Sequence, residues 1–124
     1  MTNNICGIHH CSIIVKDTNE ALLFYVNILG LKKNDQRPDL GYPGAWLDAG
    51  DQQIHLLQLP NPDPQEGRPQ HGGRDRHVAL AVRSMDIIVT KLEEAGLDFT
   101  VSRSGRRALF CRDPDNNAVE IVER

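Results

Sequence analysis

The spacing of apolar and polar positions follows the same course twice along the chain. Residues 10–16 and 77–83 alternate between larger apolar side chains and smaller or polar ones, which is typical of a strand with one buried face. Residues 18–29 and 85–95 then place apolar side chains at helical spacing. The pattern therefore predicts a strand followed by an amphipathic helix, twice.

Residues typical of helix ends flank both predicted helices. Asp17 precedes the first helix and Glu20 follows three residues later, which resembles a capping box. Ser84 takes the capping position before the second helix. Gly30 and Gly96 come after the helices and suit the left-handed residue that ends many of them. These signals predict where each helix begins and ends.

A predicted β-hairpin follows each helix. In the first copy, strands at 46–49 and 53–57 flank a short turn, and in the second copy strands at 108–111 and 119–122 do so. The chain thus consists of a duplicated strand–helix–hairpin unit. The predicted fold class is α+β.

The length and composition fit one domain. The 124 residues are 40% hydrophobic and 25% charged, and a chain of this length buries a core without needing disulfides. We expect a single domain over residues 1–124, with modules at roughly 7–59 and 75–123. The connection 60–74 is rich in proline and glycine, which is typical of a linker.

Charge and hydropathy exclude several classes of protein. The 14 basic and 17 acidic residues give a net charge of −3, without the basic surface of a nucleic-acid-binding protein. No apolar run approaches the ~20 residues of a membrane span, and no signal peptide is visible. We therefore expect a cytoplasmic protein that contacts neither nucleic acid nor a membrane. Cys6, Cys11 and Cys111 are expected to be buried or half-buried free thiols.

Four residues of metal-binding type fall at equivalent places in the two units. His10 and His77 begin the first strands, and His55 and Glu120 lie in the last ones. A histidine at a strand start is more often a surface or hydrogen-bonded residue, but a carboxylate in an apolar strand needs a partner. Three imidazoles and one carboxylate suit a divalent ion such as Zn²⁺, Ni²⁺, Mn²⁺ or Fe²⁺. The coincidence of four positions favours a metal site.

Small neighbours leave room beside these residues. His10 shares its strand face with Ser12, and His77 shares its face with Ala79, while the bulkier residues face the helices. His9 is the alternative to His10. Alternation along a strand sends the two to opposite faces, and the repeat favours His10.

Four motifs resemble the vicinal oxygen chelate superfamily, which includes glyoxalase I, fosfomycin-resistance proteins, extradiol dioxygenases, methylmalonyl-CoA epimerase and bleomycin-binding proteins. They are His10-x-x-Ile-x-Val-x-Asp17, Phe24-Tyr25-x3-Leu29-Gly30-Leu31, His77-Val-Ala-Leu-Ala-Val and Asp113-Pro-Asp-Asn-Asn-Ala-Val-Glu120. The resemblance covers roughly residues 7–123 and implies two βαβββ modules forming an open eight-stranded mixed barrel around a metal ion. Its ligand positions correspond to His10, His55, His77 and Glu120.

The resemblance implies a lyase or isomerase like glyoxalase I (lactoylglutathione lyase). The metal ion would chelate vicinal oxygens of a small substrate and stabilise an enediolate, while Glu120 or His55 moves a proton. Glyoxalase I-like sites carry a glutamate where this chain has His55, which leaves Glu120 as the carboxylate. Two alternatives stay open. One is an Fe²⁺ extradiol-type dioxygenase with His10, His77 and Glu120 as ligands, and the other is a non-enzymatic protein that sequesters a small molecule such as an antibiotic.

Candidate substrate-binding residues lie in or beside the loops. Arg37, Tyr42 and Trp46 adjoin a loop rich in glycine and proline, and Arg74 lies in the linker. Such a cationic rim suits a carboxylate, phosphate or glutathione-like group, although loop charges are more often simply solvated. The basic pairs 32–33 and 106–107 are expected in turns and receive no role. The resemblance and the linker both allow a homodimer, which we expect.

Overall fold

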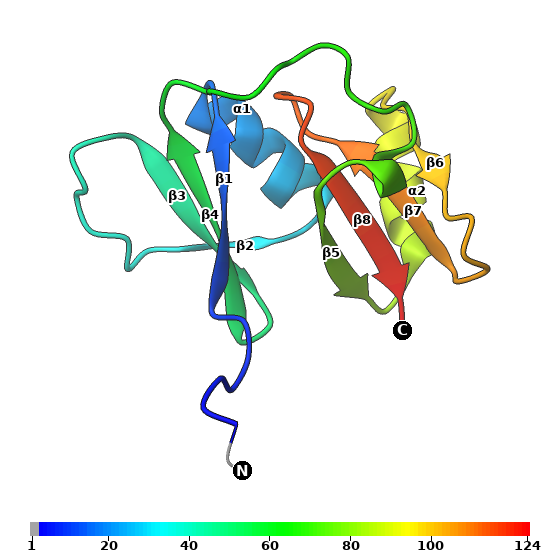
Figure 1. Cartoon of the computed structure of the whole chain (residues 1–124), viewed down its shortest axis with the longest axis horizontal. Coiled ribbons are helices and arrows are strands. Elements are labelled where there is room, and N and C mark those ends of the chain that lie inside the picture. The colour runs from blue at the N-terminus through cyan, green and yellow to red at the C-terminus, as the bar shows by residue number, and fades with distance from the viewer. Residues whose placement is uncertain (1–2) are drawn as a thin grey trace.

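Figure 1 shows the computed structural model of the chain, which describes residues 3–124 as two four-stranded sheets. The first sheet has the order β1-β4-β3-β2 and the second the order β5-β8-β7-β6. The strands of the first sheet are β1 (His10–Val15), β2 (Lys32–Asn34), β3 (Gly44–Ala49) and β4 (Gln52–Gln58). Those of the second are β5 (His77–Val82), β6 (Thr100–Val101), β7 (Ala108–Arg112) and β8 (Ala118–Glu123).

Both sheets are mixed and have the same topology. The outer strands β1 and β5 run parallel to β4 and β8, whereas the remaining pairs are antiparallel. The sheets are not closed on each other (Figure 1). The structure therefore confirms the α+β class and the paired βαβββ modules.

The first helical segment begins at the predicted cap. The side chain of Asp17 accepts a hydrogen bond of 3.0 Å from the backbone N–H of Glu20. α1 (Thr18–Leu22) then continues as the π-helical segment η1 (Leu23–Ile28). Gly30 follows with φ of +86°, as the left-handed residue expected at this end.

The second helix, α2 (Met85–Glu94), begins differently from the prediction. Ser84 occupies the capping position, but its side chain makes no capping hydrogen bond. The backbone N–H of Met85 instead donates to Oε2 of Glu123 at 2.9 Å, so a residue of β8 provides the acceptor. Gly96 ends the helix with φ of +69°.

One hydrophobic core joins the two modules and both helical segments. Its fully buried side chains are Val15, Tyr25, Leu47, Leu56, Leu92, Leu109, Cys111, Val119 and Ile121. Cys11, Ile13 and Val15 of β1 face this core, so His10 and Ser12 lie on the opposite, exposed face of the strand. β5 follows the same pattern, with its histidine on the exposed side.

The turn at residues 113–117 fastens the second module to the first. The hydroxyl of Tyr25 donates to Oδ2 of Asp113 at 2.7 Å, and both residues are buried. The backbone N–H of Lys16 donates to Oδ1 of Asp115 at 2.9 Å. The amide of Asn117 donates to the carbonyl of Ile14 at 3.2 Å. These bonds set the position of one sheet relative to the other.

The connection between the modules packs on the second sheet. Its short 3₁₀ helix η2 (Gly72–Arg74) lies so close that a Cβ on Gly72 would be 3.0 Å from the Cβ of Phe110. Asp75 accepts hydrogen bonds from both Arg68 and Arg112 at 2.7–3.1 Å. Burial opposes ionisation of Asp75, but these bonds outweigh it and lower its pKa to about 2.

The structure contains two short strands, β2 and β6, that the sequence pattern did not predict. Lys32 and Lys33 lie in β2 and pair with Asp48 and Leu47, so the expectation of a turn there is wrong. β6 pairs with β7 in the same way. Both are edge strands whose hydrogen bonds come from a neighbour, and neither is long enough to show its own alternation.

The cysteines and the helices also bear on the initial expectations. Cys111 is buried and Cys11 is half-buried, as expected. Cys6 lies before β1 and is exposed, so the expectation of a buried or half-buried thiol is wrong there. In the described part of the chain, no helix has the length and apolar character needed to cross a membrane.

Candidate functional site

Each sheet carries two of the four candidate metal ligands. In the first half-site, formed by His10 and His55, the ring centroids are 4.0 Å apart with an interplanar angle of 14°. In the second half-site, Nε2 of His77 lies 3.1 Å from Oε1 of Glu120. Over residues 3–124, no group of three or more His, Cys, Asp or Glu side chains is positioned to hold a metal ion. The structure thus brings the four residues together two by two.

The first half-site extends into a stack of aromatic rings. Trp46 of β3 is the register partner of His55 in β4, and its ring stacks on the imidazole at 4.5 Å. Nε2 of His55 is 2.8 Å from Oε1 of Gln53. Burial and then the positive charges of neighbouring His10, His9 and Arg37 lower the pKa of His55. A lowered pKa favours the neutral imidazole, which is the form that binds metal ions.

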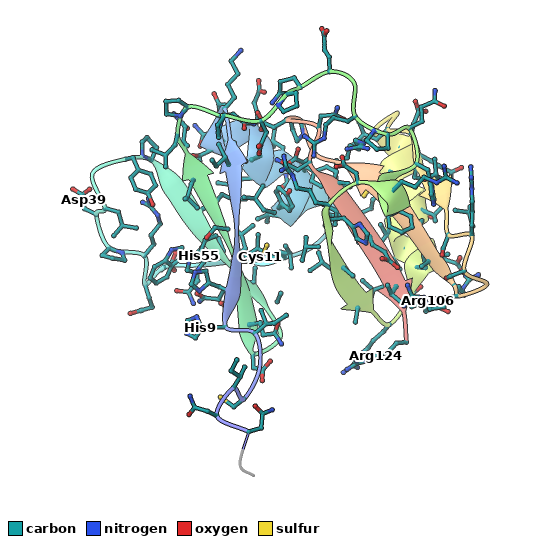
Figure 2. The ribbon with its side chains drawn as sticks, in the orientation of Figure 1. His9, Cys11, Asp39, His55, Arg106 and Arg124 are labelled. Atoms are coloured by element: carbon teal, nitrogen blue, oxygen red, sulfur yellow. The ribbon has the colours of Figure 1, made fainter. Side chains whose placement is uncertain are left out.

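His9 does not point away from the first half-site. β1 begins at His10, so strand alternation does not extend to the preceding residue. Nδ1 of His9 lies 2.9 Å from Nδ1 of His10, and the two rings meet edge to face. The expectation of opposite faces is therefore wrong, and Figure 2 shows His9 near His55 beside the first sheet.

In the second half-site, the orientation of His77 is set by its backbone neighbour. Nδ1 of the ring lies 2.8 Å from the carbonyl oxygen of Asp75, which only accepts hydrogen bonds, so Nδ1 carries a proton. In a neutral ring Nε2 then has a lone pair, and that lone pair faces a carboxylate oxygen of Glu120. Two acceptors at this distance need a cation between them, either a proton or a metal ion. The donor set is therefore suited to a divalent ion.

Arg106 belongs to the second half-site, although the sequence suggested no role for it. Its Nη2 donates to Oε2 of Glu120 at 3.1 Å. The carboxylate is 4% exposed, while the arginine side chain is 61% exposed and reaches in from the loop before β7. The sequence pointed to Arg106 only indirectly, since the Glu120 carboxylate lies in an apolar strand and such a group requires a partner.

The candidate substrate-binding residues fall in three places. Trp46 adjoins the first half-site through its stacking on His55. Arg37 pairs with Tyr42, donating to its carbonyl oxygen at 2.8 Å with the guanidinium 5.2 Å from the ring centre. Arg74 is exposed in η2, on the side of the second sheet. The structure therefore brings Trp46 to a half-site and leaves the two arginines at the margins.

The seam between the modules is hollow beside the second half-site. A cleft of about 290 Å³ separates β1 from β5, with Ser12 and His77 among its lining residues. Its volume is near the lower end of that of small-molecule sites. Figure 2 shows His55 beside the first sheet and Arg106 beside the second, so the two half-sites of one chain lie on different sheets.

Two βαβββ modules with histidine or carboxylate side chains on their first and last strands define the vicinal oxygen chelate class of protein. The chain belongs to the Glyoxalase/Bleomycin resistance protein/Dioxygenase superfamily, whose sequence profile matches residues 7–121.

Three known proteins illustrate the range of this similarity. The chain is 30% identical to glyoxylase I 4 of Arabidopsis thaliana over 123 residues, which is 95% of this chain and 71% of that protein. A glyoxalase family protein from Bacillus anthracis has a similar structure, with a TM-score of 0.82, 25% identity and coverage of 100% and 99% of the two chains. The antibiotic-binding protein TnmS3 from Streptomyces sp. CB03234 has a TM-score of 0.74 at 20% identity, with 98% of each chain covered. This last likeness concerns the fold alone.

Proposed function

We propose that the chain is a divalent-metal-dependent lyase or isomerase of the glyoxalase I type, acting on a small substrate with vicinal oxygens. The observation that carries this proposal is the second half-site, where a buried carboxylate and an imidazole nitrogen lie 3.1 Å apart. The similarity to glyoxylase I 4 of Arabidopsis thaliana supports the same class of reaction.

The residues that would hold the metal ion are His10, His55, His77 and Glu120. When bound, the ion supplies Lewis-acid chemistry, polarising the substrate's vicinal oxygens and acidifying the adjoining C–H group. Within residues 3–124 the two half-sites lie on different sheets and do not form a group of three or more ligand side chains. A complete site would therefore form where the first module of one copy lies opposite the second module of another. The proposed protein is therefore a homodimer with a composite site.

Glu120 is the proposed general base. Its side chain is 4% exposed, and the ring of Phe110, its register partner in β7, packs against His77. Burial keeps water away from the carboxylate, which is the basic group that would remove a proton from the substrate. His55 is the alternative base. Its pKa is lowered, so its imidazole is neutral and accepts a proton at neutral pH.

Arginines near both half-sites favour a substrate with an anionic group. The charge of Arg37 acts on His55 in the first half-site, and Arg106 reaches Glu120 in the second. Guanidinium groups bind carboxylates and phosphates by paired hydrogen bonds. We therefore place a carboxylate, phosphate or glutathione-like group of the substrate at this rim, with Trp46, Tyr42 and Arg74 as further candidate contacts.

Replacing Glu120 tests the proposed reaction. Glu120→Gln keeps the size and one oxygen donor but removes the basicity, so we expect most of the bound metal to remain. Turnover of a hemithioacetal substrate should fall by about 10²–10⁴-fold, the usual contribution of a general base. Glu123→Gln is the matched control, since it makes the same chemical change in the same strand, at a residue that binds Arg107 and the start of α2. Metal content and rate are measured on the same preparations.

The alternative functions give different results in this experiment. An extradiol-type dioxygenase would be purified with iron, and excess Fe²⁺ would partly restore activity to the Glu120→Gln variant. A sequestering protein would show no turnover, and the substitution would change the affinity for the ligand alone. The ring stack of Trp46, His55 and His10 is the observation that favours this second alternative, because planar ligands stack on such surfaces. Full metal content with undiminished turnover would leave His55 as the base.

The composite site predicts a specific assembly. Light scattering at micromolar concentration should give twice the chain mass of 13.9 kDa. A mass of one chain that does not change with concentration would contradict a site shared between two copies.

A further inference from the structure

Glu120 has both of its carboxylate oxygens engaged. Oε1 lies 3.1 Å from Nε2 of His77, and Oε2 accepts a hydrogen bond of 3.1 Å from Nη2 of Arg106. The carboxylate is 4% exposed, so an unpaired negative charge there would be costly. Arg106 supplies the permanent positive charge at this position.

Arg106 is held more loosely than Arg112 of the same sheet. Besides Glu120, its guanidinium donates to the hydroxyl of Ser104 at 3.2 Å, within its own loop. Its side chain is 61% exposed. The loop also closes on itself, through a 2.8 Å hydrogen bond between the hydroxyls of Ser102 and Ser104. Arg106 can therefore swing away from Glu120 at the cost of a hydrogen bond to Ser104 within its own loop.

Arg112 shows what a structural arginine looks like in this sheet. It is 20% exposed and donates to the carboxylate of Asp75 and to the carbonyl oxygens of Asn116 and Pro69. Its bonds link β7 to the connection between the modules. The contrast indicates that Arg106 serves the carboxylate of Glu120 rather than the packing of the sheet.

A guanidinium and a divalent ion compete for the same carboxylate. The two cations repel each other at close range, and each needs an oxygen of Glu120. We propose that Arg106 is a displaceable counter-ion, which neutralises Glu120 in the metal-free protein and gives up the carboxylate when a divalent ion binds. The guanidinium released in this way lies at the rim of the site, where it binds the anionic group of the substrate. This inference rests on the proposed metal-dependent function.

This exchange of Arg106 for a metal ion at Glu120 predicts that removing Arg106 strengthens metal binding. We would titrate the metal-free full chain with Zn²⁺ and Ni²⁺ by calorimetry, comparing wild type, Arg106→Gln and Arg103→Gln. Arg106→Gln should bind the ions about three- to fivefold more tightly, the upper part of the range expected for release of a partly exposed ion pair. The metal affinity of Arg103→Gln should stay within about twofold of wild type. This variant removes the same charge from the same exposed loop, so it reports the effect of net charge alone.

A second measurement reports on Arg106 directly. In ¹⁵N NMR spectra of the wild type, the Arg106 Nε–H signal should move towards the position of a solvated arginine as Zn²⁺ is added. If the wild type binds metal but Arg106→Gln behaves like Arg103→Gln, or binds more weakly than wild type, the exchange is wrong and the metal-dependent function stands. If the wild type binds neither ion, the metal-dependent function fails and the exchange fails with it.

Discussion

The hydrogen bond between Tyr25 and Asp113 gives a sharp test of how the two modules are held together. It joins η1 to the turn before β8, at 2.7 Å, with Tyr25 0% and Asp113 5% exposed. Tyr25→Phe removes the hydroxyl and nothing else, so the hydrophobic packing of the ring is retained. We expect the variant to fold and to be less stable.

The size of the effect follows from what remains around the carboxylate. A hydrogen bond to a charged group contributes about 1.5–3 kcal/mol. Asp113 keeps two backbone donors, Asp115 and Asn117, and the side-chain amide of Asn117 still donates to Oδ2 at 2.9 Å. Since these bonds still solvate the charge, the loss should lie near the lower end, at about 1.5–2 kcal/mol of unfolding free energy.

The penalty should depend on pH. Burial raises the pKa of Asp113, against the hydrogen bonds from Asn117 and Tyr25 that lower it. A carboxyl whose pKa is raised on folding contributes stability that is full below its unfolded pKa and is lost as pH rises through the folded pKa. Removing the hydroxyl raises the pKa of Asp113 further. The variant therefore loses more stability at pH 7 than at pH 4, because a larger fraction of the carboxyl is ionised at the higher pH.

Urea denaturation at both pH values measures these differences. Tyr42→Phe is the matched control, because within residues 3–124 the Tyr42 hydroxyl has no hydrogen-bond partner, and it should cost less than about 0.5 kcal/mol. A Tyr25→Phe variant within 0.5 kcal/mol of wild type, or one with the same penalty at pH 4 and pH 7, would refute the reasoning.

Two further predictions concern the second sheet. His77→Ala should weaken Zn²⁺ or Ni²⁺ binding by about tenfold or more because it removes a proposed ligand. His71, which precedes η2 and contacts the hydroxyl of Thr100, is the control, and His71→Ala should change metal binding little; equal effects in elemental analysis would remove His77 from the site. Asp75→Asn should cost about 2–4 kcal/mol, because it leaves Arg68 and Arg112 without their buried carboxylate. Since the folded pKa of Asp75 is about 2, below its unfolded value, its stabilisation is present above about pH 4 and is lost as pH falls towards 2; a denaturation midpoint insensitive to pH across that window would contradict this role.

Much of the fold could be predicted because its signals are local. Strand alternation placed Cys11, Ile13 and Val15 on the core side of β1, and the structure confirms it. Asp17, Gly30 and Gly96 marked helix ends through backbone conformations that depend on a few neighbouring residues. The strands β2 and β6 escaped this reasoning, since each is defined by pairing with a neighbour rather than by its own pattern.

The sequence predicted the residues of the candidate site, and the tertiary structure decided which of them meet. Repetition in the sequence selected His10, His55, His77 and Glu120, because equivalent positions in two copies of one unit place side chains on equivalent faces. Which of them meet was decided by the tertiary structure, which stacks the first two on one sheet and pairs the last two on the other. The engagement of Arg106 with Glu120 also arose there, since it depends on the path of an exposed loop, and contacts across space leave no period in the sequence.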